Sequence, residues 1–204
     1  MGRRSVRRYL PQPVDAAALD RILLAATSAP SAHNRQPWRF AVIERLSVKT
    51  ALARAMGARL SEDRLRRGDD PEVVAADVAR SAARLTEAPA FVVFSLTMRE
   101  MDVYHDAGQT RAEYLMAAQS VAMAMQNALL AACAEGLGAC VMCAPLFCPD
   151  VVRETLRLPV DWEPQALITL GVAANAGRER GRKPLREVML RIDALPERCE
   201  GGAP

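Results

Sequence analysis

Aromatic residues and histidines are scarce in this chain of 204 residues. Phe, Trp and Tyr make up 4% of it while hydrophobic residues reach 50%, so the core must be built mainly from Ala, Leu, Val and Met. The two histidines, His33 and His105, are too few for a metal centre built on imidazole ligands, and we expect no metal. The length suits one compact domain, which we expect to span residues 1–204.

A large excess of one charge is also lacking, because 27 basic residues stand against 24 acidic ones. A nucleic-acid binder would show a basic excess across the domain, so we expect no nucleic-acid partner. No apolar stretch follows the arginine-rich start, as a secretory signal would require, and the five cysteines are an odd number. We therefore expect reduced thiols in the cytoplasm. A transit peptide is the alternative, and the nearby Asp15 and Asp20 argue against it.

Several familiar catalytic motifs are missing, including Gly-x-Gly-x-x-Gly, the Walker A sequence and Gly-x-Ser-x-Gly. The stretch 136–140 starts like the first of these but lacks its third glycine and follows a predicted helix. Cys140, Cys143 and Cys148 raise the question of a redox or metal site. The first two lie three apart in a predicted strand, where they point to opposite faces, and no second Cys-x-x-Cys occurs. Buried small hydrophobic residues are favoured over a redox or metal role.

Periodicity and cap residues predict an irregular mixture of helices and strands. The predicted helices cover 15–29, 47–56, 71–86, 110–135 and 149–156. The predicted strands cover 40–44, 90–97, 139–144 and 166–173. The charged stretch 61–70 is expected to be mobile or to face a partner, and 194–204 to form a disordered tail. The absence of regular βα alternation favours an α+β fold over a doubly wound parallel sheet.

The longest predicted helix, 110–135, is apolar around most of its circumference and ends at Gly136. Polar Gln119, Ser120, Gln126 and Asn127 lie in its middle and would be costly in lipid. We therefore expect a helix buried in a domain core or a dimer core, and no membrane span.

Arginines gather near both ends of the chain. The stretch 3–9, "RRSVRRY", holds Arg3, Arg4, Arg7 and Arg8 around Ser5. The segment 178–188 contributes Arg178, Arg180, Arg182, Lys183 and Arg186. Arginine binds phosphate through two parallel hydrogen bonds, and a serine hydroxyl adds a third contact. The two clusters could meet at one dianion, and two solvated arms are the alternative.

A short loop between Pro30 and Pro37 carries further polar groups, namely Ser31, His33 and Asn34. Because proline fixes φ, such a loop is stiff and can hold these groups at defined positions. A ligand-binding loop and an ordinary connection both fit this pattern.

Together the two motifs resemble the nitroreductase family of flavin enzymes. That family shows Arg-Arg-Ser-x-Arg near its start and Ala-Pro-Ser-x-x-Asn-x-Gln-Pro-Trp after its first helix, which match residues 3–7 and 29–38. The resemblance extends over about 3–193. It implies an α+β nitroreductase fold, with a central, mostly antiparallel sheet flanked by helices. It also implies a homodimer with the long helix at its interface and two FMN sites between the subunits.

The resemblance implies a set of cofactor-binding positions. Those around the FMN phosphate and the flavin N1/O2 edge are Arg3, Arg4, Ser5, Val6, Arg7, Arg180 and Arg182. Those contributed by the partner subunit are Pro30, Ser31, His33 and Asn34. Those along the flavin ring are Met142, Cys143, Ala144, Pro145 and Leu146, where many members carry Pro-Ile-Glu-Gly in place of Ala-Pro-Leu-Phe. Because the flavin carries the hydride, no catalytic side chain is required.

A narrower resemblance covers "FCPDVVRETLRLPVDWEP" (147–164) and "LRRGD" (65–69). Both are similar to the flavin domain of the bifunctional coenzyme F420:L-glutamate ligase. This implies a dehydro precursor of F420, or a related deazaflavin, as substrate, with Asp63 as its contact. The match begins at residue 3, so we expect a free-standing version of that domain, with a separate F420 glutamate ligase as a candidate partner.

The leading hypothesis is thus an FMN-dependent oxidoreductase that transfers a hydride between flavin and a small conjugated substrate. An NAD(P)H-dependent nitroreductase or quinone reductase is the first alternative. A non-catalytic protein that binds flavin or deazaflavin is the second. The electron donor is expected to be NAD(P)H or F420.

Overall fold

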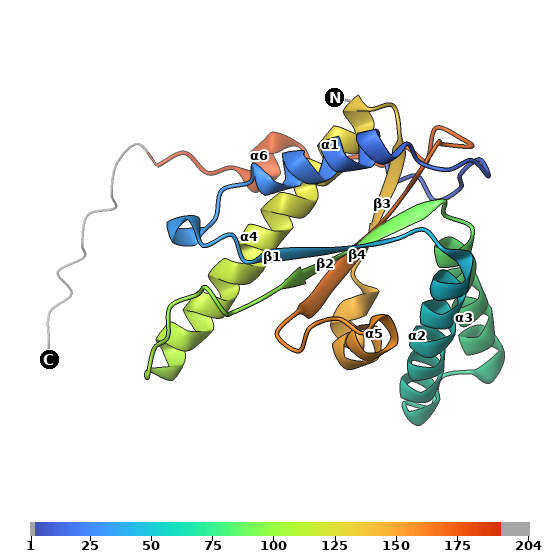
Figure 1. The fold of residues 1–204 in the computed structure, drawn as a ribbon, viewed down its shortest axis with the longest axis horizontal. Coiled ribbons are helices and arrows are strands. Elements are labelled where there is room, and N and C mark those ends of the chain that lie inside the picture. Colours follow the sequence, from blue (N-terminus) through green and yellow to red (C-terminus); the bar gives the residue numbers. More distant parts are fainter. Residues whose placement is uncertain (1–2, 193–204) are drawn as a thin grey trace, which may run out of the picture.

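The computed structural model describes residues 3–192, and its core is a four-stranded antiparallel sheet with the order β1-β2-β4-β3 (Figure 1). The strands are β1 (Trp38–Ile43), β2 (Ala90–Leu96), β3 (Gly138–Met142) and β4 (Glu163–Gly171). The α-helices are α1 (Ala16–Thr27), α2 (Leu46–Arg66), α3 (Pro71–Thr86), α4 (Ala107–Ala134), α5 (Pro149–Leu156) and α6 (Leu185–Val188). Two 3-10 turns, η1 (Ala32–Asn34) and η2 (Ala144–Phe147), complete the list. The expected α+β fold is confirmed.

Each face of the sheet packs against its own group of helices. Along β2, Val92 and Phe94 belong to the core shared with α1 and α4, whereas Phe91 and Val93 belong to the core shared with α2, α3 and α5. A strand covered on both faces is apolar throughout, and every residue of β2 is buried. The sheet is therefore a middle layer between two helical layers.

Helix α4 is the long central helix that the sequence predicts, and its C-terminal end is set by Gly136. Gly136 has φ +75°, and the N–H groups of Gly136 and Leu137 donate to Cys133 and Ala132, closing a Schellman motif. By length and composition, α4 is the single described helix that could cross a membrane. It packs instead against α1 and the sheet, as expected for a core helix.

Helix α2 is longer than predicted, and the expected end near Met56 is wrong. Gly57 does not break the helix, because α2 and α3 pack so closely there that a Cβ would lie 3.0 Å from Val78. The charged stretch 61–70 forms the last turns of α2 and the connection to α3. Arg64 closes that connection with hydrogen bonds to Asp69 and Asp77. Its charge pattern is thus typical of a helical hairpin tip.

Other boundaries shift by a few residues. Asp106 rather than Thr110 begins the long helix, because its carboxylate accepts the Gln109 N–H at 2.8 Å. The predicted strand 139–144 ends at Met142, where η2 starts after Cys143. Asp70 caps α3 ahead of Pro71 as expected. The predicted tail 194–204 lies outside the described residues.

The N-terminal segment lies between β3 and the chain that leaves β4. Ser5 pairs with Ala139 of β3, and Tyr9 pairs with Ala173. The Tyr9 hydroxyl donates to the Val6 carbonyl at 2.7 Å and also contacts Thr169, and burial raises the pKa of this phenol strongly. These contacts bring the two arginine-rich ends of the sequence together.

Candidate functional site

The two basic segments line one cavity of about 300 Å³, here called the arginine cavity. Its lining residues are Arg3, Arg4, Ser5, Arg7, Arg178, Glu179, Arg180 and Arg182. Six guanidinium groups and one hydroxyl therefore face a common space, with a single carboxylate among them. Such a donor set matches a phosphate dianion, because arginine presents paired N–H groups with the geometry of phosphate oxygens. Of the two interpretations of the arginines, the structure favours the convergent one.

The backbone at this cavity depends on one glycine. Gly177 has φ +69°, and a Cβ there would lie 3.1 Å from the Ser5 carbonyl oxygen. The Asn175 side chain accepts the Gly177 N–H at 3.0 Å and fixes the turn. This close approach lets the basic segment after β4 come beside Arg4 and Ser5. The Arg4 guanidinium meets Glu179 of that segment at 2.9 Å.

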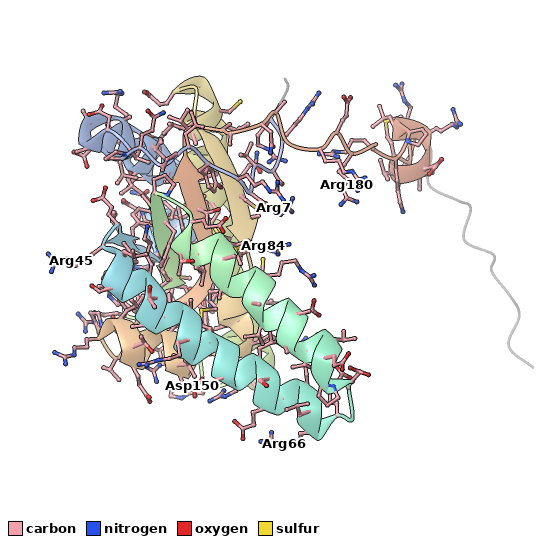
Figure 2. The ribbon with its side chains drawn as sticks, turned by 90° about the vertical axis from the view of Figure 1, so that its right-hand side faces the viewer. Arg7, Arg45, Arg66, Arg84, Asp150 and Arg180 are labelled. Carbon is pink, nitrogen blue, oxygen red and sulfur yellow. The ribbon has the colours of Figure 1, made fainter. Side chains whose placement is uncertain are left out.

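Arg84 of α3 also reaches this side of the molecule, near Arg7 (Figure 2). Burial raises the pKa of the Cys140 thiol on β3, and the positive charges of Arg7, Arg84 and Arg3 partly oppose that rise. The charges of three arginines are thus felt at the middle of β3. Sequence reasoning missed Arg84, because an arginine on an amphipathic helix has the same pattern as a solvated one.

A second cavity of about 310 Å³, here called the apolar cavity, lies between the α2–α3 hairpin and the β3–η2–α5 segment. Its lining is mostly apolar: Ala53, Met56, Gly57, Leu60, Ala82, Leu85, Met142, Ala144, Phe147 and Cys148. Four polar side chains join it, namely Arg59, Asp63, Arg67 and Ser81. The structure thus brings Asp63 together with Met142 and Ala144, three positions that the sequence implicates. Burial raises the pKa of the Cys148 thiol in this cavity, which keeps that thiol protonated at neutral pH.

The remaining positions implied along the flavin ring are spread around η2. Cys143 and Leu146 are exposed, whereas Pro145 is buried. Val6, from the arginine-rich start, is buried and packs beside Gly138. Cys140 is buried and Cys143 exposed, and both are free thiols. The favoured interpretation of the three cysteines as buried small side chains agrees with the placement of Cys140 and Cys148. It is wrong for Cys143, which follows the end of β3 and is exposed.

The loop between the two prolines has an unusual backbone. His33, Asn34 and Gln36 all have positive φ, at 48°, 54° and 49°. The loop is held by the Ser31 hydroxyl, which accepts the Gln36 N–H at 3.0 Å, and by Arg35, which meets Asp102 at 2.5 Å. Strained backbone of this kind gathers at ligand sites.

This loop lies apart from the arginine cavity of its own chain. None of its polar residues lines either cavity described above. The assignment of Pro30, Ser31, His33 and Asn34 to the flavin site of a partner subunit stays a prediction of the family resemblance.

The contact between Arg35 of the loop and Asp102 is extended by a hydrogen bond from Asp102 to helix α4. The backbone N–H of Asp102 donates to Glu113 at 3.0 Å, and Glu113 is only 1% exposed. Among the described residues, the other Glu113 oxygen and the Arg35 Nε are buried without a partner. The first turns of α4 thus anchor the loop through a chain of charged groups.

An α+β fold with an arginine-lined cavity of this kind is compatible with the class of proteins that bind a phosphate-bearing cofactor. Comparison with known families is more specific: the sequence profile of the nitroreductase family matches residues 1–172. The chain belongs to the nitroreductase family. This membership confirms the family resemblance and the expected class of enzyme, an FMN-dependent oxidoreductase.

The individual relatives are named for different activities. An NADH dehydrogenase of Thermus thermophilus is 33% identical, with 92% of this chain and 91% of the relative covered. A 5,6-dimethylbenzimidazole synthase of Rhodobacter capsulatus is 31% identical, with coverage of 83% and 79%. A nitroreductase-like structure of Desulfovibrio desulfuricans in complex with FMN has a TM-score of 0.71 at 26% identity, with coverage of 96% and 94%. A BluB-like flavoprotein of Clostridium difficile reaches a TM-score of 0.75 at 22% identity, with coverage of 93% and 95%, and supports the fold alone.

Proposed function

We propose that this protein binds FMN with the phosphate in the arginine cavity and transfers hydride from NAD(P)H to a small conjugated acceptor. The observation that carries the proposal is the convergence of Arg3, Ser5 and Arg182, from opposite ends of the chain, on one cavity. The NADH dehydrogenase among the relatives supports NADH as donor. FMN, when bound, supplies the hydride chemistry, and the protein supplies binding and electrostatics.

The residues of this chain have distinct tasks in that scheme. Arg3, Arg182 and the Ser5 hydroxyl donate hydrogen bonds to the phosphate oxygens. Arg7 and Arg84 place positive charge near Cys140 of β3, and this charge would favour the anionic form of a flavin ring bound close by. The apolar lining along Met142 and Ala144 would exclude water from a ring bound beside it.

The same proposal includes a homodimer. The strained loop with Ser31 and His33 would complete the FMN site of the other copy. Exposed apolar residues support this assembly: Leu115 and Met123 on α4 are 47% and 38% exposed, and Leu190 beyond α6 is 81% exposed. Free thiols in the described residues agree with a reducing compartment such as the cytoplasm.

Loss of an arginine from the cavity tests the flavin half of the proposal. Arg3→Ala should weaken FMN binding by about 1.5–3 kcal/mol, the value of a hydrogen bond to a charged group. Arg8→Ala is the matched control, because Arg8 is exposed and does not line the cavity. Fluorescence titration of apoprotein with FMN measures both affinities. Equal affinities in the two variants, or no FMN binding by the wild type, would contradict the assignment.

A dehydro precursor of F420, or a related deazaflavin, is a second candidate for the substrate. The position of Asp63 in the cavity that Met142 and Ala144 line favours it. Stopped-flow mixing of the FMN-reduced protein with either acceptor class discriminates between the two. Reoxidation by nitroaromatics or quinones alone would reject the deazaflavin, and with it a role beside an F420 glutamate ligase. A bound flavin that no donor reduces would favour the non-catalytic alternative.

A further inference from the structure

The apolar cavity has walls that the protein holds in place without a ligand. On one side, Arg59 of α2 makes a two-pronged contact with Asp150 of α5, at 2.7 and 3.3 Å (Figure 2 labels Asp150 beside α2). On the other side, α2 packs closely on α3 at Gly57. Ion pairs at the α2–α3 connection tie the tip of the hairpin. The cavity is therefore preformed rather than a gap between mobile parts.

Two opposite charges at the end of α2 line this cavity and have only long internal ion pairs. Asp63 lies in the last turns of α2, and Arg67, four positions further on, is the C-cap residue of that helix. Among residues 3–192 no ion pair joins them. The carboxylate nearest to Arg67 is Asp69 at 3.9 Å, and Arg64 already binds Asp69 at 2.5 Å. Within the described part of the chain, the Asp63 carboxylate has one ion pair, a long one with Arg66 at 3.5 Å, and its charge also helps to raise the pKa of the nearby Arg59. The charge of Arg59, by contrast, is neutralised by Asp150.

One hydrogen-bond acceptor, the Asp63 carboxylate, and one donor, the Arg67 guanidinium, thus line the same cavity. The rest of its lining is mostly apolar. A planar ligand with an N–H beside a C=O satisfies both, because Asp63 accepts from the N–H while Arg67 donates to the carbonyl. A ligand with acceptors alone, such as a quinone or a nitroaromatic, leaves the carboxylate opposite an oxygen. A carboxylate ligand suits Arg67 but is repelled by Asp63.

We propose that the apolar cavity is a subsite for planar rings that carry adjacent N–H and C=O groups, as in a cyclic imide, a lactam or a carboxamide. Asp63 accepts a hydrogen bond from the N–H of the ligand, Arg67 donates one to its C=O, and the apolar side chains of the cavity pack against the ring. The subsite rests on the proposed function in one respect: Met142 and Ala144, implicated beside the flavin, line the same cavity. A hydride donor with a carboxamide and an acceptor with a cyclic imide share this edge chemistry.

Matched pairs of small probes test the subsite by calorimetry on the FMN-loaded protein. Phthalimide offers the N–H and C=O edge, and N-methylphthalimide differs from it only by the blocked N–H. Nicotinamide and N,N-dimethylnicotinamide form the equivalent carboxamide pair. At least one unblocked probe should bind about tenfold more tightly than its methylated partner, as expected for a hydrogen bond to a charged group. The pair that shows the preference identifies the imide or the carboxamide as the source.

Variants separate the two side chains. Asp63→Ala should abolish the preference for the unblocked probe, and Arg67→Ala should weaken both members of a pair equally, because both keep the carbonyl. Glu72→Ala is the matched control: it removes an exposed carboxylate in the first turn of α3 that lies outside the cavity. Retained FMN binding reports that each variant is folded.

Several results would overturn the subsite. These are equal affinities within both probe pairs, a preference that survives Asp63→Ala, or displacement of the probe by FMN in the apoprotein, which would make the cavity the flavin's own. The flavin proposal fails separately. A protein that binds no FMN but keeps an Asp63-dependent preference would lose the flavin and retain the subsite.

Discussion

Within residues 3–192, Glu179 is the one acidic side chain that lines the arginine cavity, and it already pairs with Arg4. A bound phosphate must compete with this carboxylate for the same guanidinium. Glu179→Gln should therefore tighten FMN binding about two- to fivefold, the range expected for an exposed ion pair. Glu187→Gln on α6 is the matched control, since Glu187 does not line the cavity. Weaker binding of FMN by Glu179→Gln would show that the carboxylate positions Arg4 instead of competing for it.

The residues around the arginine cavity show which site residues can be predicted from the sequence and which cannot. Arg3, Ser5 and Arg182 follow from motifs and from the chemistry of phosphate, so their convergence could be anticipated from the sequence. Arg84 could not, because nothing in the spacing of α3 separates an arginine that faces a site from one that faces water. Asp63 needed the packing of α2 on α3 and η2 before its place in a cavity could be seen.

The loop that contains η1 stores backbone strain, and glycine can test that strain. In the left-handed region an ordinary residue costs about 1–2 kcal/mol, while glycine loses about 0.5–1 kcal/mol through chain entropy. His33→Gly should therefore leave the free energy of unfolding unchanged or raise it by up to about 1.5 kcal/mol, because His33 is exposed at φ 48°.

Urea unfolding of the apoprotein measures this effect. Ala32→Gly, at a neighbouring position with ordinary φ, is the control and should lose about 0.5–1 kcal/mol. If His33 contacts flavin, His33→Gly also weakens FMN binding, so that stability and function change in opposite directions. Equal destabilisation by both glycines would mean that the loop is unstrained.

Helices α1 and α4 are joined at their surface by Arg21 and Glu135, at 2.7 Å. The hydrogen bond from Arg21 holds the pKa of Glu135 below its ordinary value of 4.5. A carboxyl whose pKa is lowered in the folded state stabilises the fold above its unfolded pKa, and that contribution disappears as the pH falls through the lower, folded value.

Arg21→Gln should accordingly unfold at lower urea concentration than the wild type near pH 7, with the difference vanishing on acidification below pH 4.5. Arg54→Gln, an exposed arginine of α2 without an ion pair among the described residues, should show no such pH-dependent difference. A gap between Arg21→Gln and wild type that stays constant down to low pH would exclude the linkage.

Elements were predictable where local rules dominate. The Asp15 and Asp70 caps, the Gly136 end of α4 and the apolar strand β2 all follow from cap chemistry and hydrophobic pattern. The length of α2 was not predictable from the sequence, because a glycine followed by a charged run is typical of a helix end. Only the packing of Gly57 against α3 shows why the helix continues.

At the scale of the whole molecule, the segment after β4 forms an arm. It runs away from the body and leads into α6 (Figure 2). Leu185, Val188, Leu190 and Ile192 on this arm are all more than 60% exposed. A run of exposed apolar side chains favours burial against another surface. Together with the apolar side of α4, the arm supports a second copy of this chain as that surface.

A complementation experiment tests the shared site directly. Arg3→Ala removes a phosphate contact, whereas His33→Ala removes a contact that we assign to the opposite subunit. Each homodimer then has two defective sites. After subunit exchange, half of the dimers are mixed, and each mixed dimer has one intact site and one doubly defective site. About a quarter of the wild-type FMN-binding capacity should therefore return.

A mixture of Arg3→Ala with Arg182→Ala is the control. Both residues line the cavity of one chain, so every mixed site keeps one defect and no capacity returns. Recovery in neither mixture would place His33 outside the FMN site, and recovery in both would separate Arg3 from Arg182.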